Sequence, residues 1–342
     1  MDQHIARLEA LLSFLIRSLS PLDANAHPID LLPYEYRKKI ALVEEEIAYA
    51  MRLRRNLESL RQMDVTKYST PERFTYINNN IVRYLDYGSP DSDKILILLH
   101  GLGGSAERWS RVIPNIVSTK KDFRVIIPDI IGFGYSDKPR DFDIDYSMDF
   151  FVEGFLRPFL DNLHISKASI IGSSFGGHIA TEFAIRFNYM VEKLILVSPA
   201  GMMKRSTPTL DKYLKAAFDP ERQRVYDAFR EMVYNPRVVN EKMVRDFMNR
   251  MRLPNAMYAF NSTLMNMVHA PELRGRVSNI TAPSLIVWGE NDSMIPLAEN
   301  ANEYNGIPNK ILRNLFVVIK KCGHLPPIEK PSAFSKIVLK CI

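Results

Sequence analysis

The chain has 342 residues, with 45 Lys or Arg against 39 Asp or Glu, and its formal net charge is +6. Because 46% of the residues are hydrophobic and only 15 are glycine, the composition is that of a globular protein with a large core and excludes collagen and disordered chains. Two cysteines, Cys322 and Cys341, are too few for a disulfide scaffold, so we expect a reducing, cytoplasmic compartment. The small positive excess does not indicate a nucleic-acid partner.

Residues 1–66 are predicted to form a helical extension. Apolar residues recur at helical spacing from Ile5 to Leu19 and again from Ile40 to Leu60. The apolar run at residues 10–16 is too short to cross a membrane and is a poor match to a signal peptide, so we expect no transmembrane segment. We expect a helical pair packed on the rest of the chain. A homodimer interface or a membrane-surface contact is the alternative.

From residue 67 onward, short apolar runs alternate with stretches of helical pattern. The runs occupy residues 94–99, 124–127, 168–171, 193–197, 284–287 and 315–319. They are apolar on both faces, which is typical of buried parallel strands, and helical patterns at 146–163 and 175–187 separate some of them. Residues 74–78 and 81–87 are predicted to pair antiparallel at the edge. The class predicted is α/β, with a mostly parallel sheet covered by helices on both sides.

The alternation stops between residues 200 and 275, where we expect a helical insertion. Asp219, Asn240 and Asn255 are each placed to begin a helix. Nine of the 15 methionines lie in this segment, and such flexible, polarizable side chains suit an adaptable apolar pocket. Packing inside the insertion itself is the alternative. We predict a cap, or lid, at 200–275 that divides a core of residues 67–199 and 276–342.

A sharp turn with a serine follows the apolar run at 168–171. The sequence Gly172-Ser173-Ser174-Phe175-Gly176 fits the G-x-S-x-G pattern, and a predicted helix comes directly after it. In that strand-turn-helix context the serine hydroxyl lies at the carboxyl edge of the sheet, close to a helix N-terminus. We therefore predict that Ser174 is a catalytic nucleophile.

A serine hydroxyl needs a general base and an acid that orients the base. Asp292 follows the run at 284–287, and His324 follows the run at 315–319, so both can lie at the same sheet edge as Ser174. Glu290 is the rival for the role of the acid. We predict a catalytic triad of Ser174, Asp292 and His324.

Hydrolysis through a tetrahedral intermediate also needs two donors for the oxyanion. The Phe175 N–H follows the nucleophile and begins the predicted helix. The glycine-rich stretch 100–104, which lacks the residues of a phosphate-binding loop, supplies the second donor, the Leu102 N–H. The predicted oxyanion hole is therefore Leu102 and Phe175.

Taken together, these segments resemble the α/β-hydrolase family in its serine-nucleophile, capped branch. The resemblance covers about residues 73–342 and includes the glycine-rich stretch, the segment 129–139, the serine turn and the Gly323-His324 pair. It implies an eight-stranded sheet, a cap and a hydrolase without cofactor or metal. Because residue 174 is serine, the aspartate-nucleophile epoxide hydrolases and haloalkane dehalogenases are disfavoured. The helical extension lies outside the family pattern.

The expected reaction is hydrolysis of a small carboxylic ester with an apolar acyl or aryl group, through an acyl-enzyme. The first alternative is carbon–carbon bond hydrolysis, as in the meta-cleavage-product hydrolases that the chain also resembles. The charge of the cap gives weak support to this alternative. Residues 200–275 contain 13 Lys or Arg against 8 Asp or Glu, and this positive excess could attract anionic substrates. Against it, residues 100–105 lack a Gly-Pro-Gly, and Leu325 stands where those enzymes often place Trp. A non-catalytic, ligand-binding member of the fold is the second alternative.

Overall fold

A computed structural model describes residues 71–140, 144–311 and 316–342. The chain divides into two units, Met1–Thr70 and Pro71–Ile342, and all of the described residues belong to the second unit. The predicted helical extension at 1–66, and with it the homodimer and membrane-surface expectations, lies outside the described residues. Within the described ranges, no helix has the length and apolar character that a membrane span requires.

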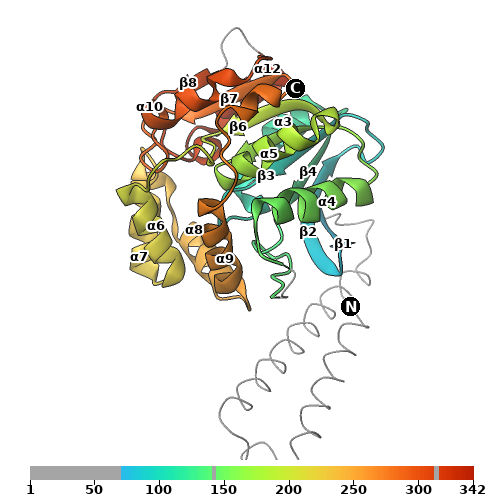
Figure 1. Cartoon of the computed structure of the whole chain (residues 1–342). Helices are drawn as coiled ribbons and strands as arrows, with labels where there is room; N and C mark the ends of the chain where they lie inside the picture. Colours follow the sequence, from blue (N-terminus) through green and yellow to red (C-terminus); the bar gives the residue numbers. More distant parts are fainter. Residues whose placement is uncertain (1–70, 141–143, 312–315) are drawn as a thin grey trace, which may run out of the picture. The chain divides into compact units, whose positions relative to one another are not determined.

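The centre of the described unit is an eight-stranded sheet with the order β1-β2-β4-β3-β5-β6-β7-β8 (Figure 1). The strands are β1 (Glu72–Ile77), β2 (Asn80–Gly88), β3 (Ile95–Leu99), β4 (Arg124–Pro128), β5 (Ala168–Ser173), β6 (Val191–Val197), β7 (Ser284–Gly289) and β8 (Phe316–Ile319). The β1–β2 and β2–β4 pairs are antiparallel, and all other neighbours are parallel. The structure confirms the predicted mostly parallel sheet with its antiparallel edge.

The apolar strands divide the core into two layers because successive side chains point to opposite faces. In β3, Ile95, Ile97 and Leu99 belong to one buried cluster, while Leu96 and Leu98 belong to the other. Both faces of the strand are therefore covered, which explains why the run is apolar at every position.

Helices cover both faces of the sheet. On one face lie the π-helix η2 (Phe150–Leu156), α4 (Arg157–Asn162) and α5 (Phe175–Arg186), which bury Phe155 and Phe183 in the larger cluster. On the other lie α3 (Ile113–Thr119) and α12 (Pro331–Cys341), which bury Ile113 and Phe334 in the second cluster. The shorter helices are η1 (Ala106–Trp109), η3 (Asn188–Met190), η4 (Pro236–Val238), η5 (Arg276–Asn279), α10 (Leu297–Asn300), η6 (Ala301–Gly306) and α11 (Pro326–Glu329).

The insertion between β6 and β7 is helical, as predicted, and consists of α6 (Pro208–Phe218), α7 (Arg222–Glu231), α8 (Glu241–Met251) and α9 (Ala256–Val268). In Figure 1 these four helices form a group beside the sheet. Tyr213, Phe229 and Phe247, from three of the helices, contact one another with ring centroids 5.2–6.4 Å apart. The cap therefore has an aromatic core of its own.

The helix starts inside the cap agree only in part with the sequence. Asn240 caps α8, since its side chain accepts a hydrogen bond from the Met243 N–H. Asn255 precedes α9 but makes no side-chain capping bond. The prediction for Asp219 was wrong: this residue ends α6, and the chain turns through Pro220 before α7 begins. A capping residue followed by proline therefore does not mark a helix start when the same residue already ends the preceding helix, as Asp219 does.

Candidate active site

Ser174 occupies a strained turn between β5 and α5. Its backbone has φ 54° and ψ −116°, a left-handed φ that non-glycine residues rarely adopt. The turn is crowded: a Cβ on Gly172 would lie 2.3 Å from the Gly176 carbonyl oxygen, and one on Gly176 would lie 2.5 Å from that of His100. Only glycine fits at both positions, and the strained backbone presents the Ser174 side chain at the carboxyl edge of the sheet.

His324 and Asp292 form a buried pair at the carboxyl ends of β8 and β7. The His324 Nδ1 lies 2.9 Å from Asp292 Oδ2. The other carboxylate oxygen accepts hydrogen bonds from the Met294 and Ile295 N–H groups, at 3.0 and 2.9 Å. Because an ionised carboxylate only accepts, Nδ1 carries the proton and the Nε2 lone pair is free to act as a base.

Glu290, the rival acid, lies elsewhere. Its side chain is exposed, and it accepts a hydrogen bond from the Lys321 N–H at 3.3 Å. The His324 backbone N–H donates to the Met232 carbonyl at 2.8 Å, so the end of α7 holds the histidine loop. The cap thus contributes directly to the position of His324.

Four of the five predicted site residues line a single pocket: Leu102, Ser174, Phe175 and His324. The fifth, Asp292, does not line the pocket but contacts His324. No hydrogen bond joins Ser174 Oγ to His324 in the described part of the chain, and in substrate-free enzymes such bonds are often long. The sheet has therefore brought together residues that are up to 222 positions apart in the sequence.

The loop that carries Leu102 lies against Ser174. A Cβ added to Gly101 would lie 3.2 Å from Ser174 Cβ. The Tyr213 hydroxyl, from α6, donates to the Leu102 carbonyl at 2.6 Å and fixes the orientation of that peptide. Burial raises the pKa of Tyr213 to about 12, so the hydroxyl stays protonated and remains a donor at neutral pH. This cap-to-loop hydrogen bond has no signature in the sequence.

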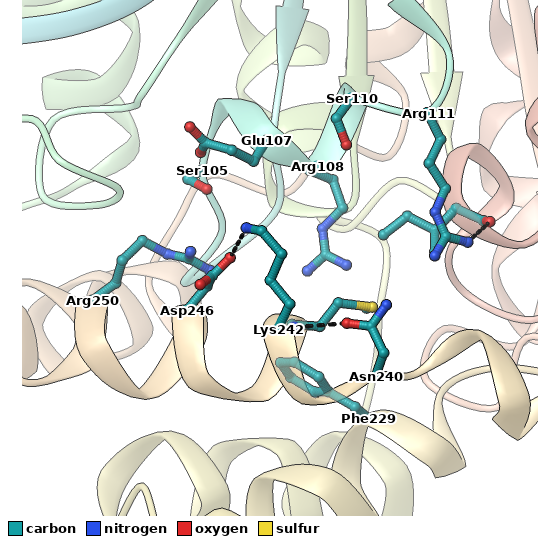
Figure 2. A pocket seen from close by; sticks show the side chains of 12 residues that line it. Ser105, Glu107, Arg108, Ser110, Arg111, Phe229, Asn240, Lys242, Asp246 and Arg250 are labelled. Atoms are coloured by element: carbon teal, nitrogen blue, oxygen red, sulfur yellow. Dashed lines mark hydrogen bonds and ion pairs between the residues drawn. The ribbon is translucent and has the colours of Figure 1, made fainter.

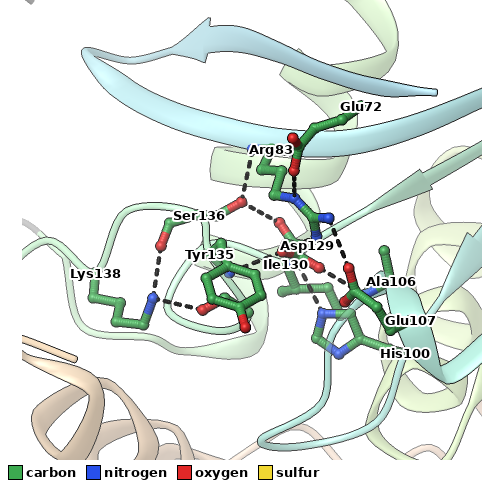
Figure 3. Close-up of polar contacts among 11 residues, drawn as sticks. Glu72, Arg83, His100, Ala106, Glu107, Asp129, Ile130, Tyr135, Ser136 and Lys138 are labelled. Atoms are coloured by element: carbon green, nitrogen blue, oxygen red, sulfur yellow. Dashed lines mark hydrogen bonds and ion pairs between the residues drawn. The ribbon is translucent and has the colours of Figure 1, made fainter. Parts of the chain in front are cut away.

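A polar network that the sequence did not reveal holds the same loop (Figure 3). His100 Nε2 accepts a hydrogen bond from the Ile130 N–H at 3.0 Å, so Nδ1 is the protonated nitrogen and donates to the Gly101 carbonyl at 2.8 Å. Burial lowers the pKa of His100 to about 4, which keeps the ring neutral and this pattern intact at neutral pH. His100 therefore ties the start of the loop to the chain after β4.

Asp129 is the centre of this network. Its carboxylate accepts from the Ala106 N–H at 2.6 Å, the Tyr135 N–H at 2.8 Å and the Arg83 guanidinium at 2.9 Å. Arg83 also pairs with Glu72 and Glu107, at 2.5 and 2.6 Å. Strand β2, which lies between β1 and β4, is thereby connected to Ala106 and Glu107 at the end of the glycine-rich loop.

The pocket has an apolar wall and encloses about 90 Å³. Three cap methionines line it, Met203, Met232 and Met267, together with Met294 from the core. Arg108 is the one cationic side chain that contributes to its wall among the described residues, apart from the imidazole of His324. The pocket thus accepts an apolar group and offers one positive charge.

A parallel sheet, a strained serine at its carboxyl edge and a helical cap define an α/β hydrolase. A family model described as "alpha/beta hydrolase fold" matches residues 94–331, and the chain belongs to this family. The match confirms the family resemblance.

The relatives have more specific names. The chain is 28% identical over 267 residues to the 2-hydroxy-6-oxononadienedioate/2-hydroxy-6-oxononatrienedioate hydrolase of Paraburkholderia phymatum, covering 75% of this chain and 89% of that protein. It is 29% identical over 258 residues to the 2-hydroxymuconate semialdehyde hydrolase of Pseudomonas sp. CF600, covering 71% and 84%. A solved meta-cleavage product hydrolase from Pseudomonas fluorescens IP01 superposes with a TM-score of 0.67 at 24% identity, covering 78% of this chain and 96% of that one.

Proposed function

We propose that the chain is a serine hydrolase in which Ser174 is the nucleophile, His324 the general base and Asp292 the group that orients it. The observation that carries this proposal is the 2.9 Å pair between His324 and Asp292 in the wall of the pocket that contains Ser174. With Nδ1 held by Asp292, the Nε2 atom of His324 is available for the serine proton.

The reaction proceeds in two halves. Ser174 Oγ attacks the substrate carbonyl carbon while its proton passes to His324, and the oxyanion accepts hydrogen bonds from the Leu102 and Phe175 N–H groups. The bond to the leaving group breaks, its electron pair goes to the leaving group, and His324 returns the proton to it. Water then attacks the acyl-enzyme in the same way and releases the acid and free Ser174.

For the bond that is cleaved, we favour the carbon–carbon bond of a 2-hydroxy-6-oxo dienoic acid over the ester that the sequence alone suggested. The support is the names of the relatives, which are hydrolases of 2-hydroxy-6-oxononadienedioate, 2-hydroxy-6-oxononatrienedioate and 2-hydroxymuconate semialdehyde. Arg108 in the pocket wall adds to it, because these acids are anionic. Ester hydrolysis is the second candidate, because the pocket is mostly apolar and Leu325 lines it.

The test compares the full chain with its Ser174→Ala variant on 2-hydroxy-6-oxo-6-phenylhexa-2,4-dienoate and on p-nitrophenyl butyrate. We expect the dienoate to be the better substrate and the variant to lose roughly 10⁴-fold or more of kcat on both. Ser198→Ala is the matched control: Ser198 is also buried with a left-handed φ of 42°, but its hydroxyl has no hydrogen-bond partner among the residues that the structure describes.

Each outcome decides one point. Full turnover by Ser174→Ala would show that Ser174 is not the nucleophile. A clear preference for the butyrate ester would make the protein an esterase. If wild type turned over neither substrate and a fluorophosphonate failed to label Ser174, the ligand-binding alternative would replace the proposal.

A further inference from the structure

A second cavity of about 300 Å³ adjoins the catalytic pocket, and Arg108 lines both (Figure 2). One wall comes from η1 and the residues after it, including Arg111. The other comes from α8 in the cap, which contributes Lys242 and Arg250. Figure 2 shows the Arg108 guanidinium reaching from the core side toward the α8 helix. The cavity is thus rich in positive charge.

The two carboxylates in the lining of this cavity have cationic partners of their own. Glu107 pairs with Arg83, which belongs to the network around Asp129, at 2.6 Å. Asp246 pairs with Lys242 on the same helix. Neither carboxylate forms an ion pair with Arg108 or Arg250.

Arg108 and Arg250 therefore have no anionic partner within the described ranges. The guanidinium of Arg108 forms no ion pair or hydrogen bond there, and the Arg250 Nε atom is buried without a hydrogen-bond partner. Both side chains are half-buried, and a partly desolvated guanidinium without a partner has donors that neither protein nor bulk water fully satisfies. The arrangement is typical of a site that a ligand completes.

Arg108 keeps its charge at neutral pH. Burial lowers the pKa of Arg108 to about 10, and the positive charge of Arg250 adds to this effect. An oxyanion placed between them would relieve the repulsion and accept several donors, as guanidinium groups do for carboxylates and phosphates.

We propose that Arg108 and Arg250 bind an anionic group of the substrate, a carboxylate or a phosphate, while the carbonyl that is cleaved lies at Ser174. This inference rests on the proposed hydrolase function and names the substrate class: an amphiphile with an apolar part in the methionine-lined pocket and an anionic end in the adjoining cavity. The proposed anion site is the same whether the enzyme cleaves a carbon–carbon bond or an ester.

The test uses p-nitrophenyl esters that differ only in the charge at the end of the acyl chain. One arm compares the monoester of adipic acid with the neutral hexanoate, and another replaces the terminal carboxylate by a phosphonate to separate the two anions. We expect wild type to prefer an anionic ester, and Arg108→Gln or Arg250→Gln to lower the ratio of kcat/KM values for anionic over neutral ester roughly tenfold or more. Arg108→Lys should restore part of the ratio.

The matched control is Arg245→Gln, because Arg245 lies on the same helix but is exposed and does not line the cavity. It should leave the ratio unchanged. If Arg108→Gln and Arg250→Gln also left it unchanged while Ser174→Ala abolished turnover, the anion site would be wrong and the hydrolase proposal would stand.

A binding measurement keeps the inference testable without turnover. Inorganic phosphate and adipate should raise the Tm of the wild-type chain more than that of either glutamine variant. If wild type hydrolysed nothing but showed this difference, the hydrolase proposal would fail and the anion site would survive. Equal shifts in wild type and variants would overturn the site.

Discussion

Asp292 illustrates how one side chain controls the chemistry of another. Its two carboxylate oxygens have different partners. One accepts hydrogen bonds from the Met294 and Ile295 N–H groups, and the other lies 2.9 Å from His324 Nδ1. The first pair of hydrogen bonds holds the carboxylate rigid, and the second interaction selects the imidazole tautomer with a basic Nε2. The role proposed for Asp292 depends on both of its oxygens being acceptors.

Asp292→Asn should therefore disable the site without unfolding it. An amide in this position presents a donor to His324 or leaves Nδ1 without its anionic acceptor, so the wrong tautomer is favoured. We expect kcat to fall by roughly 10⁴-fold with little change in KM, measured by steady-state kinetics on the better of the two substrates.

Glu290→Gln is the matched control, because Glu290 was the rival acid and its side chain is exposed. It should retain nearly full activity. The opposite pattern, an active Asp292→Asn and an inactive Glu290→Gln, would reverse the assignment of the acid.

At the scale of elements, the glycine-rich loop owes its shape to two supports from different parts of the fold. From the core, Asp129 after β4 and Arg83 on β2 hold the loop at Ala106, and His100 holds its start. From the cap, Tyr213 holds the Leu102 carbonyl. A backbone donor aimed at an oxyanion needs this kind of rigidity, because a flexible loop would reorganise during the reaction.

Arg83→Met tests the core support. The variant leaves the buried carboxylate of Asp129 without its cation, together with Glu72 and Glu107, which pair with the same guanidinium. Breaking a buried pair by removing one partner costs about 3–5 kcal/mol of unfolding free energy. Urea denaturation, read by circular dichroism, measures it.

Lys94→Met serves as the comparison, because Lys94 and Asp122 form an exposed pair whose side chains are 56% and 59% accessible. Removing this pair should change the unfolding free energy far less than Arg83→Met does, because exposed ion pairs are screened by water. Comparable losses in the two variants would mean that the Arg83 network contributes no more than a surface ion pair.

At the scale of the whole molecule, the large core buries titratable groups as well as apolar ones. His100 and His178 are both buried, and burial lowers the pKa of each to about 4. Neither ring nitrogen of His178 has a hydrogen-bond partner among the described residues. Both histidines are therefore neutral in the folded protein over a pH range in which they are protonated in the unfolded chain.

The fold should for this reason lose stability in mild acid. At these two histidines the unfolded chain binds more protons than the folded chain when the pH lies between about 6.5, their pKa in the unfolded chain, and about 4, their pKa in the fold. The unfolding free energy therefore falls as the pH decreases through this window. At pH 5, His100 and His178 should each lower the unfolding free energy by roughly 2 kcal/mol relative to neutral pH. Urea midpoints at pH 7, 6 and 5 measure the effect.

His178→Gln, which cannot titrate there, should remove about half of the pH dependence, whereas the exposed His164→Gln should remove none. A urea midpoint that is constant from pH 7 to pH 5 would show that the two buried rings do not control acid stability.

Much of the fold was predictable from the sequence because its signals are local. Apolar runs buried on both faces identified the parallel strands, and the spacing of glycines around Ser174 identified the strained turn. The same locality explains the error at Asp219, where a capping pattern was present but the backbone was ending α6. The expected extension at residues 1–66 lies outside the described part of the chain.

The sequence by itself determined which residue types stand at the carboxyl ends of the strands, and therefore the fold family and the choice of Ser174 and His324, with Glu290 still a rival of Asp292 for the acid. Only the tertiary structure showed that Asp292 rather than Glu290 faces His324, that Asp129 and Arg83 support the loop, and that Arg108 and Arg250 share a cavity. These pairs join elements far apart in the chain, and a hydrogen bond or a shared cavity depends on side-chain positions that no local pattern encodes.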